Sequence, residues 1–225
     1  QKEYEGSEED INNYIGGLRK TRGISLSQVL TRDSRNRAEF PTNGSTFILE
    51  NTYSGGLLGG NENFHKHLLT LEWFTPTFSK FILFNFAKIG LIKTIDVGDN
   101  TQTFIPFDER YIMGGNGIPY GNALRGYPDN VIGPQTVSGQ AVGGNSMARF
   151  ITELRYPLSD NPVIYMMAFA EMGNVWNTSA LTEPFYIDRF SSISMKKSAG
   201  VGVRFFMPGI GKLGFDMGYG FDDIT

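Results

Sequence analysis

The sequence predicts an all-β fold whose antiparallel strands cross a membrane as a β-barrel, and three observations predict it. Apolar residues recur at every second position in several segments, which gives each predicted strand one apolar face and one polar or small face. Several segments approach the length of about ten residues that a tilted strand needs to cross a bilayer. Compact, proline-bearing connections alternate with longer ones, and this sorting of loop lengths is typical of transmembrane barrels.

The alternation indicates about eight strands. They are expected at residues 23–32, 45–54, 65–74, 80–95, 145–157, 161–176, 194–208 and 211–221. The last segment is the clearest, because Leu213, Phe215 and Met217 alternate there with lysine, glycine and aspartate. Segment 80–95 is apolar on both faces, so the pattern does not assign its orientation. The longer connections are expected at 54–64, 95–145 and 175–193.

Composition narrows the classes of function. The formal net charge of -3 gives no reason to expect a nucleic-acid partner, and the lack of cysteine excludes disulfides and thiolate chemistry. The 28 glycines and 18 phenylalanines fit β-structure with tight turns and large apolar faces. The sequence has no apolar run of about 18 residues and no signal peptide at its start, so we expect a mature or truncated product. A soluble β-sandwich or Greek-key barrel is the alternative fold.

Five stretches of the sequence, at 35–44, 124–127, 142–157, 169–176 and 198–221, resemble in order and spacing the C-terminal barrel of the BamA family of outer-membrane assembly insertases. RNRAEFPTNG at 35–44 resembles the family's short periplasmic turn, and LRGY at 124–127 resembles the Val-Arg-Gly-Phe/Tyr signature of its long sixth extracellular loop. VGGNSMARFITELRYP resembles the strand after that loop. FAEMGNVW and SAGVGVRFFMPGIGKLGFDMGYGF resemble the strands that follow. The resemblance extends from residue 24 to residue 222.

The resemblance implies that residues 1–225 are the C-terminal part of one barrel domain in the outer membrane of a Gram-negative bacterium. They would supply about eight of some sixteen strands. The long loop, 95–145, would be extracellular and fold into the lumen, and the periplasmic POTRA domains and other strands would lie outside this sequence.

The implied function is the insertion of client barrels, templated at the barrel seam, without a cofactor or enzymatic chemistry. The implied partners are outer-membrane lipids, unfolded client proteins and accessory lipoproteins. Two alternatives stay open: a polypeptide transporter of the two-partner secretion type, which belongs to the same superfamily, and a passive porin-like barrel.

The resemblance also implies that an arginine at the tip of the long loop meets acidic residues of the inner wall. The candidate latch consists of Leu124, Arg125, Gly126 and Tyr127, and the candidate wall residues are Glu153, Glu171 and Gly173. Alternation along the strands independently places both glutamates on polar, inward faces. Where the family has Phe-x-Asp-x-Gly, this sequence has a glutamate at 171, which moves the carboxylate by one methylene group.

The residue types suit a latch. A guanidinium can bridge two carboxylates at once, a glycine lets the backbone turn sharply behind it, and Tyr127 can pack on the inner wall. On the residues alone, without the resemblance, a solvated loop arginine is the plainer interpretation of Arg125.

Other candidates give weaker signals. His65 and His67 share a strand face and could chelate a metal, but the absence of an evident third ligand favours a solvated pair. GGLLGG and MGGNG lack the lysine of a phosphate-binding loop and are expected to be flexible loops. Residues 108–110 are expected to form a solvated charge cluster. The sequence contains no evident catalytic triad or carboxylate dyad, so no enzymatic activity is expected.

Overall fold

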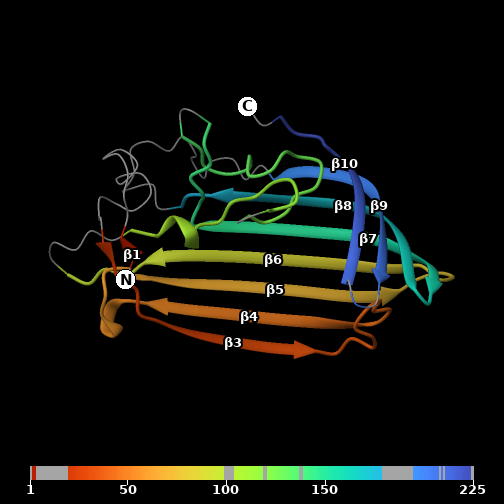
Figure 1. Ribbon diagram of the computed structural model, residues 1–225, viewed down its shortest axis with the longest axis horizontal. Coiled ribbons are helices and arrows are strands. Elements are labelled where there is room, and N and C mark those ends of the chain that lie inside the picture. The colour runs from red at the N-terminus through yellow and green to blue at the C-terminus, as the bar shows by residue number, and fades with distance from the viewer. Residues whose placement is uncertain are drawn as a thin grey trace.

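The computed structural model describes residues 2–3, 20–98, 104–118, 121–136, 139–178, 195–207, 209 and 211–223. Eight strands form one antiparallel sheet in chain order (Figure 1). They are β3 (Ser25–Asp33), β4 (Gly44–Ser54), β5 (Phe64–Pro76), β6 (Ile82–Thr94), β7 (Ser146–Asp160), β8 (Val163–Trp176), β9 (Lys196–Met207) and β10 (Gly211–Gly220). The predicted all-β, antiparallel fold is therefore confirmed.

Four small elements accompany the sheet, and the sequence pattern did not predict them. The two-residue strands β1 (Lys2–Glu3) and β2 (Lys20–Thr21) pair with each other. Short 3-10 helices, η1 (Gly56–Leu58) and η2 (Phe107–Glu109), lie in two of the connections. Within the described ranges, none of the helices is long and apolar enough to cross a membrane.

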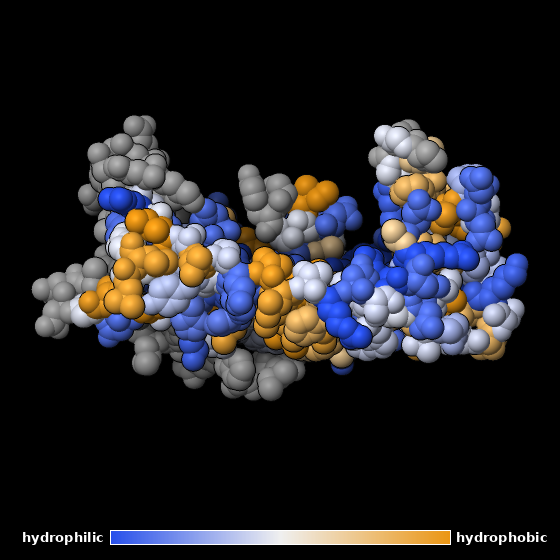
Figure 2. Space-filling view, turned by 90° about the horizontal axis from the view of Figure 1, so that it is seen from below, coloured by the Kyte–Doolittle hydropathy of each residue, from blue (hydrophilic) through white to orange (hydrophobic). Residues whose placement is uncertain are grey.

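The two faces of the sheet differ as the alternation predicts. In β8, Tyr165, Met167 and Phe169 are buried on the inner face, whereas Met166 and Met172 on the outer face are 49% and 40% exposed. Figure 2 shows hydrophobic residues reaching the surface across the middle of the molecule. An outer face rich in exposed apolar side chains is what a bilayer requires of a strand wall.

The sequence did not assign the orientation of segment 80–95, and the structure explains why. Two apolar clusters cover the two ends of the inner face of β6. Ile82 and Phe84 join an inner apolar cluster near one end of the sheet, and Ile92 joins another near the opposite end. Because apolar groups cover both ends of its inner face, β6 is apolar inside as well as outside.

The division into long loops at one end of the sheet and short turns at the other has one exception, the pair of connections 34–43 and 55–63. Connection 55–63, expected among the long ones, is no longer than the turn 34–43 at the other end of the sheet. That turn is long because it carries Phe40 inward, where its ring centroid lies 4.8 Å from that of Tyr165. The remaining turns at that end are short, and the longest connection, 95–145, lies at the end opposite to them (Figure 1).

The two edges of the sheet are β3 and β10, so the sheet is open rather than closed. Every residue of β3 is exposed. An exposed strand edge offers unpaired backbone N–H and C=O groups to any further strand.

Candidate functional site

The candidate site lies where the long loop crosses the inner face of the sheet. Isolated backbone bridges fold the loop upon itself, among them Met113 with Asn122 and Gly115 with Leu124. Leu124 is fully buried in an apolar cluster shared by the loop and the strands. Burying a leucine contributes about 2 kcal/mol, so this side chain alone favours a docked loop.

Arg125 follows this anchor and contacts both predicted carboxylates. Its Nε atom lies 2.6 Å from Glu171 Oε1, and its backbone N–H donates to the same oxygen at 2.9 Å. Its Nη2 atom donates to Glu153 Oε1 at 2.8 Å. The guanidinium also lies 3.6 Å from the ring centroid of Phe169, within the range of a cation–π contact. The structure therefore brings together Arg125, Glu153 and Glu171.

Four further charged residues of the inner wall extend this contact into a network. Arg149 Nη2 donates to Glu171 Oε2 at 2.9 Å, and Arg155 Nη2 lies 2.7 Å from Glu153 Oε2. The other two members, Arg204 and Asp216, form a bidentate pair at 2.7 Å.

The sequence contained a signal for these four residues, because alternation places each of them on the same polar face as the glutamates. Arg125 Nη1 lies 3.7 Å from Asp216 Oδ2, so the loop arginine approaches a third carboxylate as well.

Charge balance explains why the arginine is held. Glu153 and Glu171 are each only 4% exposed, and each accepts one wall arginine in addition to Arg125. Burial on its own lowers the pKa of Arg125, but the two carboxylates outweigh burial and raise the pKa overall. The side chain therefore stays cationic, and a buried cation with three carboxylates around it resists withdrawal into water.

Glycines on both sides make the close approach possible. Gly126 has a φ of 88°, and a Cβ there would lie 2.7 Å from the backbone carbon of Tyr219. A Cβ at Gly218 would lie 3.0 Å from the backbone nitrogen of Gly126, and one at Gly220 would lie 2.7 Å from the ring of Tyr127. The loop therefore rests on a stretch of β10 whose inward side chains are absent.

Tyr127 ties the loop to the ends of β9 and β10. Its hydroxyl lies 2.5 Å from the carbonyl oxygen of Lys197 and 3.1 Å from Asp222 Oδ2. Burial, followed by the nearby carboxylate, raises the pKa of Tyr127. The pKa of Asp222 is lowered, because the backbone N–H of Lys197 and the tyrosine hydroxyl both donate to its carboxylate.

Gly173, predicted with Glu153 and Glu171 as a wall partner of the latch, lies next to Met113 instead. A Cβ at this position would lie 2.7 Å from the sulfur of Met113, so the glycine makes room for another part of the loop. Its register partner in β7 is Arg149. It therefore borders the charge network without touching Arg125.

The charge cluster at 108–110 is less solvated than expected. Arg110 is 9% exposed, and its Nε donates to the carbonyl oxygen of Ile105 at 2.9 Å. Glu109 accepts a hydrogen bond from Lys66 Nζ at 2.9 Å. The expectation of a solvated cluster was wrong for Arg110, which the folded loop buries, whereas the side chain of Glu109 is still 36% exposed beside Lys66.

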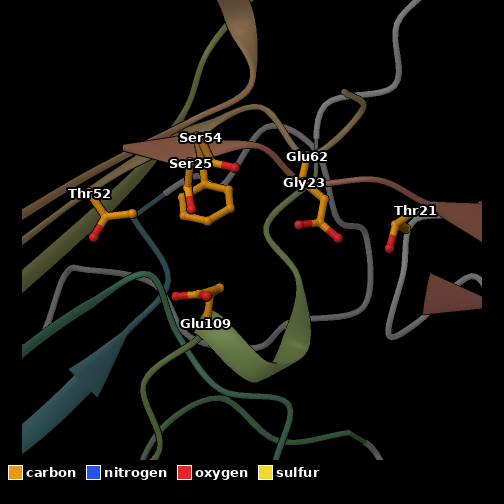
Figure 3. Close-up of a pocket in the computed structure, with 8 residues that line it drawn as sticks. Thr21, Gly23, Ser25, Thr52, Ser54, Glu62 and Glu109 are labelled. Carbon is orange, nitrogen blue, oxygen red and sulfur yellow. The ribbon is translucent and has the colours of Figure 1, made fainter. Parts of the chain in front are cut away.

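A polar cavity of about 180 Å³ lies apart from the latch, near the ends of β3, β4 and β5 (Figure 3). Glu62 and Glu109 line it from the connections, and Thr52 and Ser54 line it from β4. No pattern in the sequence indicates this cavity, because its lining comes from segments far apart in the chain.

Comparison with known proteins assigns the family. The chain matches the Omp85 superfamily domain over residues 2–224. It is 28% identical over 220 residues to "Outer membrane protein assembly factor BamA" of Nitratidesulfovibrio vulgaris, a match that covers 95% of this chain and 26% of that protein. The chain thus spans about a quarter of the length of this relative. Proteins of this family lie in the outer membrane of Gram-negative bacteria, and so does this one. The chain belongs to the Omp85 superfamily, as a BamA-like member.

Proposed function

We propose that the chain is part of the barrel of an outer-membrane insertase, which folds β-barrel client proteins into the lipid bilayer. Similarity to an outer-membrane protein assembly factor over nearly the whole chain supports this proposal. Residues 1–225 would form the C-terminal part of the barrel, and the remaining strands would close it along the edges of β3 and β10.

The observation that carries the proposal is the docked loop. Arg125 joins the loop to two wall carboxylates by hydrogen bonds of 2.6 and 2.8 Å, inside a wall whose outer face is apolar. Such a latch would hold the barrel in one shape while its seam strands pair with an incoming client strand. Backbone hydrogen bonds at an exposed strand edge are the physical basis of such pairing.

No chemical step is needed in this proposal. The burial of client side chains in lipid supplies the driving force, at about 25 cal/mol for each Å² of apolar surface. The partners in the proposal are outer-membrane lipids, unfolded client barrels and accessory lipoproteins.

The experiment is to replace Arg125 by alanine in the full-length gene product and to measure client-barrel assembly in cells depleted of the native copy. We expect reduced assembly together with faster cleavage of the loop by proteinase K. Lys80→Ala is the matched control, because Lys80 is an exposed cation in the turn between β5 and β6.

Two outcomes would contradict the proposal. Normal assembly and normal protease resistance in the Arg125→Ala variant would exclude the latch. A large, steady single-channel conductance in the native protein, without any assembly activity, would instead indicate a porin.

A further inference from the structure

The two histidines of the chain lie together on the outer face of β5, away from the latch. His65 Nδ1 and His67 Nε2 are 3.0 Å apart. His67 is exposed and His65 is half-buried. The sequence suggested a solvated pair, whereas the structure places the two ring nitrogens in direct contact.

A neighbouring amide fixes the tautomer of His67. Asn51, its register partner on β4, places Oδ1 at 2.7 Å from His67 Nδ1. The amide orientation is set in turn by Gln28 of β3, whose Oε1 accepts from Asn51 Nδ2 at 3.4 Å. Because Asn51 Oδ1 can only accept, His67 carries its proton on Nδ1, and its Nε2 lone pair points toward His65.

The separation of the two nitrogens matches the bite of a metal chelate. Imidazole nitrogens lie about 2.0–2.1 Å from a bound zinc ion, so two of them on one ion stand about 2.9–3.4 Å apart for angles of 90° to 109°. The observed separation of 3.0 Å lies within this range, and a metal ion would replace the proton that the two rings now share. An oxygen acceptor on the far nitrogen of a histidine ligand is also usual in metal sites.

We propose that His65 and His67 bind a divalent transition metal ion of the kind that imidazole prefers, such as Cu²⁺, Ni²⁺ or Zn²⁺. No three His, Asp or Glu side chains converge on a metal position in the part of the chain that the structure describes. Water therefore completes the coordination, and the site is a two-histidine chelate with an orienting amide.

The position of the pair in the wall keeps it within reach of water. Tyr53 is the register partner of His65, and Trp73 lies on the same face of β5 near its other end. The eight residue steps from His65 to Trp73 span about 26 Å along the strand, or about 20 Å of height for a strand tilted by about 40°, which is most of an apolar barrel band of about 25 Å. Aromatic side chains mark the two rims of such bands, so the pair lies at a rim.

One neighbouring charge opposes binding. Lys93, the register partner of His65 on β6, projects from the same face. Its ammonium group repels a divalent cation, which weakens the site without blocking it. This gives the proposal a test in which affinity should rise.

The test uses the purified, untagged, full-length protein in detergent, freed of metal with EDTA and titrated with CuCl₂ and with ZnCl₂ by calorimetry. We expect one saturable site that binds Cu²⁺ more tightly than Zn²⁺, with coupling from two imidazole nitrogens in the electron spin resonance of the Cu²⁺ form. Replacing both histidines by asparagine should remove that site and the coupling.

Two single variants test the orienting and opposing groups. Asn51→Leu should weaken binding by about 10- to 100-fold, the usual effect of losing a partner behind a metal ligand. Lys93→Gln should strengthen it. Equal binding by the native protein and the double histidine variant, or no saturable binding in the native protein, would overturn the proposal. Neither result would bear on the insertase function.

Discussion

Arg125 can hold the loop because a guanidinium presents several N–H groups in one plane, directed at two carboxylates on neighbouring strands. Glu153 of β7 and Glu171 of β8 accept hydrogen bonds from the guanidinium, and the ring of Phe169 lies against the face of the guanidinium. A lysine could contact both carboxylates with its three N–H groups, but it lacks the planar fork that directs each guanidinium N–H at its own partner.

The first prediction concerns the size of this effect. Arg125→Ala should lower the free energy of loop docking by about 3 kcal/mol, at the low end for a broken buried pair, because Arg149 and Arg155 still neutralise the glutamates. Arg125→Lys should cost about half as much. The measurement is the rate of proteinase K cleavage within the loop, and equal rates for the native protein and both variants would contradict the prediction.

A second residue-scale prediction concerns pH. The pKa of Asp222 lies below its ordinary value of 3.8, first because the backbone N–H of Lys197 donates to its carboxylate and second because the Tyr127 hydroxyl of the docked loop does. Only the Tyr127 contact depends on docking, and its contribution is fully present above pH 3.8 and is lost as pH falls through the lowered pKa. Cleavage by pepsin near Tyr127 should accelerate in that acidic window, relative to Asp222→Asn measured at each pH. An identical pH profile for the two proteins would be inconsistent with this linkage.

The wall glutamates could be found from the sequence, whereas the rest of the charge network could not be assembled from it. Alternation within one strand is enough to place Glu153, Glu171 and Asp216 on inward faces. That Asp216 approaches Arg125 depends on the register of β8, β9 and β10, where Gly202 pairs with both Met167 and Asp216. No pattern within a single strand contains this information.

At the scale of elements, the strands could be predicted and the loop could not. Successive side chains of a strand point to opposite faces of the sheet, so a strand between lipid and a polar interior shows a hydrophobic period of two. The loop between β6 and β7 is instead built from isolated bridges, such as Tyr111 with Gly144, and from glycines at positive φ. Such a structure has no period, so the residue pattern indicated only the length of the loop, and its fold into the lumen was implied by the family resemblance alone.

A third prediction separates close packing from backbone strain in this loop. Gly126 and Gly139 have similar φ angles, 88° and 81°, but only Gly126 has backbone atoms where a Cβ would lie. Gly139→Ala should cost about 1 kcal/mol from strain alone. Gly126→Ala should cost clearly more and should release the loop from β10, measured by hydrogen exchange of the loop amides. Equal exchange in the two variants would mean that the loop does not rest on this strand.

At the scale of the whole molecule, the sheet is a wall between lipid and a polar interior. Its outer face carries exposed apolar side chains on β8, β9 and β10, and its inner face carries the charge network and the docked loop. The number and order of the strands could be predicted, because chain neighbours in an antiparallel wall are also neighbours in space. In the proposed barrel, further strands would pair along the open edges of β3 and β10.

A fourth prediction tests which face meets lipid. Ala170→Arg, at the middle of the outer face of β8, should destabilise the membrane-inserted protein by about 2–4 kcal/mol. Thr70→Arg, on the inner face of β5, should cost much less, because that side chain faces the polar interior. Urea unfolding in lipid vesicles, followed by tryptophan fluorescence, measures both. A larger cost for the inner-face variant would reverse the assignment of the two faces.

The most direct measurement of the central claim is a double-mutant cycle between Arg125 and Glu171, with loop-docking free energies taken from protease cleavage of Arg125→Ala, Glu171→Gln and the double variant. Because the two side chains lie 2.6 Å apart, the cycle should give a coupling energy of about 1.5–3 kcal/mol. Effects that add to within about 0.5 kcal/mol would show that the arginine does not hold the loop to the wall.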